Sequence, residues 1–400
     1  MNVTEGLTAL LDSRKVTNMT GMRFDYMVQL WRDGLTTPYA QLLDEARAQA
    51  VAAEEAGYDA ILVSEHHFDA EGFDVSPNPL MLGAALAAVT TRLRICAGAA
   101  SLPLWHPFRI AEDVAILDHI ANGRVDIALG RGLLAREIMT LNPAADRSDA
   151  ERSISLFRES VQLLKEAWTS EALTWQGEHF SFPPKDVRDL SSSWYPRNPA
   201  WRSEDGEWVG MAVVPHPLQK PHPPLFTPTE TPEGMTLAAE LGLKPQTWQP
   251  CGKRLDDLLV HYRDERRRLG EPEAVAGEGV GLLRLLFVAE SEDEARAEIE
   301  PLVEMIGRYI GGIRGKAAFA DRDEELIDED QISWFDFLRD RDHLLVGTPD
   351  AVERQIRRLQ EQHNIDHFIL WTHGVGTTHE ASMRSLELFG REVRPRFGPR

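Results

Sequence analysis

The 400-residue chain is long enough for one barrel with insertions or for two small domains, and its 42% of hydrophobic residues can form a large core. A formal net charge of −21 disfavours binding to nucleic acid and to anionic lipid. The two cysteines, Cys96 and Cys251, lack zinc-site or CxxC spacing, which argues against a disulfide framework and a cysteine-based metal site. No apolar run is long enough to span a membrane, and residues 1–22 lack a signal-peptide core, so we expect a cytoplasmic protein.

The first half of the chain alternates predicted strands and helices. Apolar runs of β-forming residues predict strands at residues 22–30, 59–63, 93–98 and 124–129. Helical periodicity predicts helices at residues 39–56, 76–89, 107–120 and 150–168. This alternation predicts parallel βαβ units, whose right-handed crossovers can close into a barrel. Residues 1–21 show little pattern and are expected to be an N-terminal extension.

The alternation is interrupted twice in the second half. Residues 170–223, rich in tryptophan and proline, predict an irregular insertion that acts as a lid, and the acidic and aromatic residues 311–348 predict a second insertion. Strands are expected at residues 224–227, 244–248, 281–289 and 367–371, and helices at residues 231–241, 255–269, 292–310, 349–362 and 380–393. The eight strands predict one (β/α)8 TIM barrel over residues 22–400 with two insertions.

Two adjacent imidazoles beside a carboxylate follow the second predicted strand. In a (β/α)8 barrel the active site lies at the C-terminal ends of the strands, and here this position holds Glu65, His66 and His67. Histidine changes its charge near neutral pH and therefore suits proton transfer. A core or helix-capping histidine is the ordinary alternative, but the strand-end position favours a functional role.

Small, cationic and aromatic residues follow other strands. Small residues at Gly98 and Ala99 let a flat ring approach the backbone, although tight helix packing explains them equally well. Arg131 between two glycines suits a phosphate, although such a tripeptide is as often a turn. A predicted helix start at Thr231 provides an anion site or an ordinary N-cap. Aromatic strand-end residues can line a flavin site or belong to the core, namely Trp31 and Trp248.

Several motifs stand in the same order as in a known family. They are Glu65-His66-His67-Phe68, Leu102-Pro103, His106-Pro107, Ala111-Glu112-Asp113-Val114, Leu117-Asp118, Gly123-Arg124 and Arg131-Gly132-Leu133. Through these residues the chain resembles the α-subunit of bacterial luciferase and its monooxygenase relatives. The resemblance is specific over residues 60–133 and looser over the rest of residues 22–168, 224–268 and 344–395.

The resemblance implies a flavin-dependent monooxygenase with particular site residues. Such an enzyme would receive reduced FMN from a separate flavin reductase, add O2 at the flavin C4a position to give a peroxyflavin, oxygenate a small organic substrate, and form a homodimer. His66 is implied as the catalytic base, and the Gly98–Ala99 peptide is implied to be cis and to lie beneath the flavin ring. The implied cofactor contacts are Arg131, Gly132, Leu133, Arg152 (with Arg147 behind it), Glu230 and Thr231. We expect the substrate pocket to include Trp31, Phe68 and Trp248.

The chain departs from the family at Gly130, where the family has a reactive cysteine, so light emission is not implied. Three other functions remain open. One is a deazaflavin (F420)-dependent oxidoreductase on the same barrel, because that cofactor is also a flat ring bearing phosphate. A metal-dependent hydrolase using His66, His67 or His106 is disfavoured because further ligands are sparse. A non-catalytic partner subunit is disfavoured by the presence of both His66 and Arg131.

Overall fold

Eight parallel strands form a closed ring in the computed structural model, which describes residues 21–32, 36–187, 198–322, 324, 326 and 333–398. The ring closes because β11 pairs with β1 and β9 pairs with β8. This architecture confirms the predicted (β/α)8 barrel. In ring order the strands are β1 (Arg23–Val28), β2 (Ala60–Val63), β3 (Arg94–Ser101), β4 (Val125–Gly130), β7 (Leu225–Pro228), β8 (Lys244–Thr247), β9 (Gly281–Val288) and β11 (His367–Trp371).

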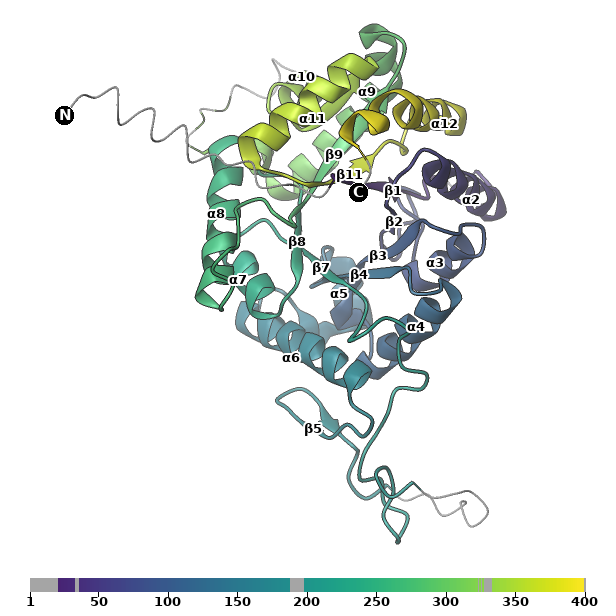
Figure 1. Cartoon of the computed structure of the whole chain (residues 1–400), viewed down its shortest axis with the longest axis vertical. Helices are drawn as coiled ribbons and strands as arrows, with labels where there is room; N and C mark the ends of the chain where they lie inside the picture. The colour runs from purple at the N-terminus through teal and green to yellow at the C-terminus, as the bar shows by residue number, and fades with distance from the viewer. Residues whose placement is uncertain are drawn as a thin grey trace, which may run out of the picture.

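Helices surround this ring (Figure 1). Several begin where the sequence places a capping residue before a proline: Asn78 accepts a hydrogen bond from the Met81 N–H, and Thr231 caps the helix that starts at Pro232. None of the described helices is both long and apolar enough to cross a membrane. The helices are α2 (Tyr39–Glu55), α3 (Pro79–Ala87), α4 (Pro107–Ile120), α5 (Ala135–Leu141), α6 (Ala150–Thr169), α7 (Pro232–Glu240), α8 (Gly252–Arg268), α9 (Glu292–Arg314), α10 (Trp334–Arg339), α11 (Pro349–His363) and α12 (His379–Leu388).

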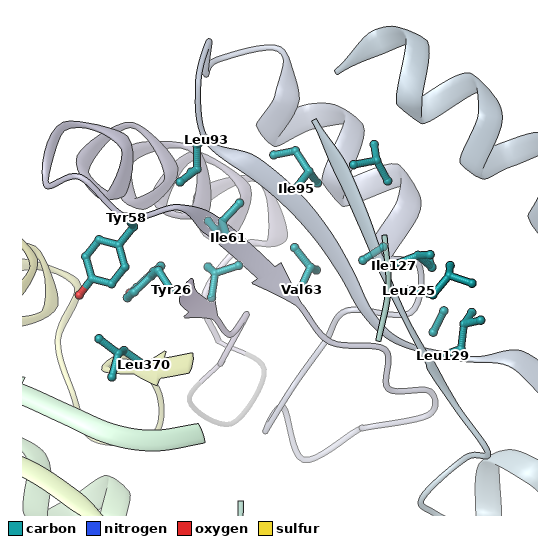
Figure 2. Close-up of a cluster of buried hydrophobic side chains, with 14 of the residues drawn as sticks. Tyr26, Tyr58, Ile61, Val63, Leu93, Ile95, Ile127, Leu129, Leu225 and Leu370 are labelled. Atoms are coloured by element: carbon teal, nitrogen blue, oxygen red, sulfur yellow. The ribbon is translucent and has the colours of Figure 1, made fainter. Parts of the chain in front are cut away.

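Alternate residues of each strand face the helices and form the main core. Figure 2 shows Ile61 and Val63 of β2 beside Ile95 of β3, with Ile127 and Leu129 of β4 farther along the same cluster. These side chains are all fully buried. Because successive strand residues point to opposite faces, the intervening residues must point into the barrel.

The inward-facing residues form two layers of different chemistry. Near the N-terminal ends of the strands, Arg23 lies between Asp25 and Asp126, at 2.7 and 2.6 Å, and His367 contacts Asp25 at 2.8 Å. Above this buried charge network lies an apolar layer. It consists of Leu62, Cys96, Ala128, Phe226 and Ile369, with Met27, Ala99 and Leu283 packed against it. In this fold the active site lies at the C-terminal ends of the strands. The apolar layer, which lies nearer those ends than the charge network, therefore forms the floor of that face.

Both predicted insertions contain elements that the sequence did not indicate. The second includes α10 and a ninth parallel strand, β10 (Leu344–Gly347), which pairs with Leu285–Val288 of β9. The first includes a short antiparallel pair, β5 (Trp175–Gln176) and β6 (Ser181–Phe182). Neither β10 nor α10 was predicted, because their few residues lie in an acidic, aromatic segment that shows no clear strand or helix period.

The first insertion lies on the outside of the barrel (Figure 1). Gln219 donates to the Asp118 carboxylate of α4 at 2.8 Å, and the His216 ring lies 3.0 Å from the Trp168 carbonyl oxygen of α6. Residues 188–197 of this insertion, and residues 1–20 of the predicted N-terminal extension, lie outside the described residues.

Candidate functional site

A cavity of about 800 Å³ opens at the C-terminal ends of the barrel strands. Its volume is within the range of small-molecule and cofactor sites. Its floor is the apolar layer of the barrel, with Met27, Leu62, Leu283 and Ile369 in contact with the cavity. The walls come from the segments that follow β2, β3, β4, β7 and β8, together with the last turn of α9.

One wall contains the small residues Gly98, Ala99 and Gly130, which come from β3 and β4. A Cβ atom added to Gly98 would lie 2.7 Å from the Cβ of Ala128, and one added to Gly130 would lie 3.2 Å from the Cβ of Ala99. The Gly98–Ala99 peptide bond is cis, as the resemblance implied. This wall therefore lets a flat ring lie directly against the main chain.

Two arginines at the adjoining end of the cavity have few or no protein partners. Arg131 makes no hydrogen bond or ion pair with any described residue, and Arg147 donates only to the Gly132 carbonyl oxygen, at 2.8 Å. Burial lowers the pKa of both guanidinium groups, and the nearby charges of Arg131 and Arg314 lower that of Arg147 further. An anion placed between the two arginines would relieve the repulsion between their like charges.

The N-terminus of α7 lines the same end of the cavity. Thr231 and Gly234 both contact the cavity, and the Thr231 hydroxyl accepts a hydrogen bond from the Gly234 N–H at 3.2 Å. The positive end of the helix dipole therefore adds to the charges of Arg131 and Arg147. These groups match the donor set that a phosphate requires.

Glu230 links three segments at the mouth of the cavity. Its carboxylate accepts hydrogen bonds from the backbone N–H groups of Trp248 and Gln249, at 3.3 and 2.9 Å, and forms an ion pair with Arg314. The fully buried Arg284 fixes the same segment by donating to the Trp248 carbonyl oxygen at 2.8 Å. The Trp248 indole, which lines the cavity, is thus held from both sides of its backbone.

His66 lies on the cavity wall opposite a buried carboxylate. Its Nδ1 is 3.3 Å from Oε1 of Glu137, and the same oxygen accepts the His67 backbone N–H at 2.7 Å. Burial opposes the charged imidazolium, but the hydrogen bond to Glu137 and the charge of Asp74 outweigh it and raise the pKa of His66. This environment favours the charged imidazolium, so the ring is suited to hold a proton at the cavity wall.

The neighbouring motif residues have structural partners. Glu65 accepts hydrogen bonds from the Ser101 backbone N–H at 2.8 Å and from the Trp105 indole at 3.0 Å, and it contacts His67 Nε2 at 2.8 Å. Glu65 therefore ties the end of β2 to the end of β3, and His67 is directed towards it. This arrangement leaves His66 as the histidine of the motif that lines the cavity.

The structure brings most of the predicted site residues together. Those that line the cavity are His66, Gly98, Ala99, Arg131, Gly132, Leu133, Glu230, Thr231 and Trp248. Trp31, Phe68 and Arg152 do not line it, so their predicted roles are not supported. Phe68 is 53% exposed and has a positive φ of 58°, which turns it out of the pocket. Arg152 is exposed and donates to the Ala144 carbonyl oxygen at 3.0 Å, while Arg147 takes the position near Arg131.

Other cavity residues were missed from the sequence. Gln246 points inward two residues before Trp248, and its side-chain N–H2 group is buried with no described partner; strand alternation could have indicated it. Ile310, Ile313 and Arg314 come from α9, whose C-terminal turn no strand-end rule could identify. No described residue of the first insertion lines the cavity, so the structure gives no support to the prediction that residues 170–223 act as its lid. Among the described residues, no cluster of three His, Cys, Asp or Glu side chains is arranged to hold a metal ion.

Comparisons with known proteins extend over most of the chain. A family model described as luciferase-like monooxygenase matches residues 22–363. The oxygenase component of a flavin-dependent trigonelline monooxygenase from Acinetobacter baylyi is 26% identical over 383 residues, which cover 94% of this chain and 96% of that protein.

Solved structures share the fold. The oxygenating constituent of 3,6-diketocamphane monooxygenase from Pseudomonas putida, a type II Baeyer–Villiger monooxygenase in complex with FMN, has a TM-score of 0.73 at 22% identity and covers 94% of this chain and 99% of its own. An F420-dependent secondary alcohol dehydrogenase has a TM-score of 0.65 at 16% identity and covers 94% and 98%. At these identities the two structures establish the fold and leave the cofactor to be argued from the site.

Proposed function

The chain belongs to the luciferase-like monooxygenase family, and we propose that it uses reduced FMN and O2 to oxygenate a small apolar molecule. The observation that carries the cofactor assignment is Arg131, which has no partner among the described residues, beside Arg147 and the N-terminus of α7. In this proposal the phosphate of FMN binds these groups. The isoalloxazine ring lies along the backbone wall formed by Gly98, Ala99 and Gly130.

Reduced FMN supplies the electrons that activate O2, with the flavin C4a position as the site of oxygen addition. The protein's part is to bind the ring, exclude water and control protons. His66 holds a proton at the cavity wall and exchanges it with the bound reactants, because it is the imidazole of the site and its charged form is stabilised.

The remaining cavity surface supports an apolar substrate. Leu283 and Ile369 belong to the floor of the cavity, and Trp248 belongs to its wall. Ile310 and Ile313 of α9 also line the cavity. An uncharged molecule can bury its surface against these side chains, whereas a charged one would lose its hydration against them.

We further propose a separate flavin reductase and a homodimer. The relative from Acinetobacter is an oxygenase component, which supports a division between reduction and oxygenation. Exposed apolar side chains on α3 and α4 support self-association, because Met81, Ile116 and Ile120 are 73%, 46% and 51% exposed. Light scattering after gel filtration tests the dimer: a monomeric mass would contradict it.

The cofactor assignment is tested by anaerobic titration of the protein with reduced FMN, reduced riboflavin and reduced F420. We expect reduced FMN to bind at least about tenfold more tightly than riboflavin, because a charge-assisted hydrogen bond is worth about 1.5–3 kcal/mol. Tighter binding of F420 than of FMN would contradict the proposal and favour a deazaflavin oxidoreductase.

A further inference from the structure

Glu137 is a buried carboxylate that does not belong to the motifs at the strand ends. It lies in the first turn of α5 and is 1% exposed. One of its oxygens, Oε1, is 3.3 Å from Nδ1 of His66 and 2.7 Å from the backbone N of His67. The carboxylate therefore contacts both the ring and the backbone of the histidine segment.

No described lysine or arginine forms an ion pair with Glu137. Arg136, the preceding residue, instead pairs with Asp69 at 3.6 Å. Burial would raise the pKa of Glu137, but the hydrogen bonds from the His66 ring and the His67 N–H outweigh it and lower the pKa. Glu137 is thus an anion whose main counter-charge is the imidazole of His66.

We propose that Glu137 is a positioning residue for His66: it accepts the Nδ1–H of the ring, so that Nε2 is left as the basic nitrogen at the cavity. This inference rests on the proposed function, in which His66 transfers protons to and from the bound reactants. A buried carboxylate that fixes the tautomer and stabilises the imidazolium plays the same part in other acid–base sites.

Other charged groups around His66 have different partners. Asp74 accepts a hydrogen bond from the Ser64 hydroxyl, and Asp69 is occupied by Arg136 and by the Asp74 backbone N–H at 2.8 Å. Several other ionisable groups face the His66–Glu137 pair. The loop after β2 contributes Asp69, Glu71 and Asp74, together with the Glu65–His67 pair. Arg136 of α5 and Tyr309 of α9 complete the set. Among these, only Glu137 is hydrogen-bonded to the His66 ring.

The tautomer of His66 in the unmodified protein is the first test and needs neither flavin nor substrate. In protein with ¹⁵N-labelled histidine, assigned with the variant H66N, the neutral His66 ring should carry its proton on Nδ1. A neutral ring protonated on Nε2 would overturn the proposal.

The variant Glu137→Gln is the second test, with Glu151→Gln on the exposed first turn of α6 as the matched control. Glutamine keeps an oxygen for the His67 N–H but removes the charge that stabilises the imidazolium. We expect the His66 titration, and with it the pH profile for oxidation of bound reduced FMN by O2, to move to lower pH. At neutral pH the rate should fall about tenfold, because the ring loses the carboxylate that fixes its tautomer and orientation; this is a part of the roughly 10²–10⁴-fold that an acid–base group contributes.

Measuring the binding of reduced FMN distinguishes failure of this inference from failure of the proposed function. Glu137→Gln should bind reduced FMN within about twofold of the wild type, since the carboxylate is not among the groups that line the cavity. An unchanged His66 titration in a variant that binds reduced FMN normally would overturn the positioning role alone. Failure of the wild type to bind reduced FMN would instead overturn the proposed function, whatever the tautomer of His66.

Discussion

Arg314, the last residue of α9, is ion-paired with Glu230, which follows β7, so that these two segments meet at the mouth of the cavity. Arg314 also donates to the Gln249 side-chain oxygen at 3.0 Å. The pair neutralises a carboxylate that would otherwise lie beside the proposed phosphate site. It also joins the helix that covers the cavity to the strand ends that form it.

Replacing Arg314 with alanine should therefore weaken binding of reduced FMN. The side chain is 36% exposed, so solvent screening limits the effect to about 1 kcal/mol, or about fivefold in Kd. The double variant with Glu230→Gln should recover most of the loss, because no unneutralised carboxylate remains. The matched control is Arg308→Ala on the same helix, where the side chain is 77% exposed. Equal losses in R314A and R308A would contradict a specific role for the pair.

Alanine at Arg131 or Arg147 should lower the affinity for reduced FMN by about 10- to 100-fold each, as expected for a lost charged hydrogen bond. Reduced riboflavin, which has no phosphate, should bind wild type and both variants alike. Arg152→Ala is the control, because that side chain lies outside the cavity. If R152A lost as much affinity as R131A, Arg152 rather than Arg147 would be the second arginine of the phosphate site.

His66→Ala should leave binding of reduced FMN largely unchanged and lower the yield of oxygenated product per flavin oxidised by about 10²-fold or more. The physical reason is that the ring lines the cavity but is not part of the proposed phosphate site. His119→Asn on α4 is the control, since its Nε2 contacts the His216 carbonyl oxygen at 3.0 Å, outside the cavity. An unchanged product yield in H66A would remove His66 from the chemistry.

The buried Asp74 predicts a pH dependence of stability. Burial, with the nearby charges of Asp69 and Glu137, raises the pKa of Asp74 from 3.8 to about 6. The folded state thus binds this proton more tightly than the unfolded state, so its stabilising contribution is present below about pH 4 and is lost as the pH rises through 6. A pKa shift of this size corresponds to a contribution on the order of 3 kcal/mol to the free energy of unfolding.

The isosteric variant Asp74→Asn should remove this pH dependence. Its free energy of unfolding in urea, relative to wild type, should increase between about pH 5 and about pH 8. Asp44→Asn provides the control, because that side chain is 75% exposed. A difference between D74N and wild type that is the same at both pH values would show that Asp74 does not titrate in this range.

The sequence predicted the barrel strands and most helices and missed the elements inside the two insertions. Helix α4 and strand β11 lie at the predicted residues, Pro107–Ile120 and His367–Trp371, because a proline start or a run of buried residues marks each boundary. The strand β10 was missed because four residues in an acidic, aromatic segment carry no measurable period.

Site residues were predictable where strand direction alone places them. His66, Arg131 and Trp248 follow three different strands, and strand ends in a barrel converge on one face. Glu137 and Arg314 belong to helices that reach the site only through tertiary packing, which leaves no local sequence signal. Phe68 was assigned to the pocket because it adjoins the histidines, but its positive φ directs it to solvent.

The central claim is that this cavity holds reduced FMN and directs its reaction with O2. Rapid mixing of the anaerobic protein–reduced FMN complex with oxygenated buffer, followed by absorbance, tests this most directly. The account predicts an intermediate whose absorbance spectrum differs from those of reduced and oxidised FMN. This intermediate should last longer than the time in which free reduced FMN is oxidised. Oxidation of the bound flavin with the spectrum and rate of the free flavin would contradict it.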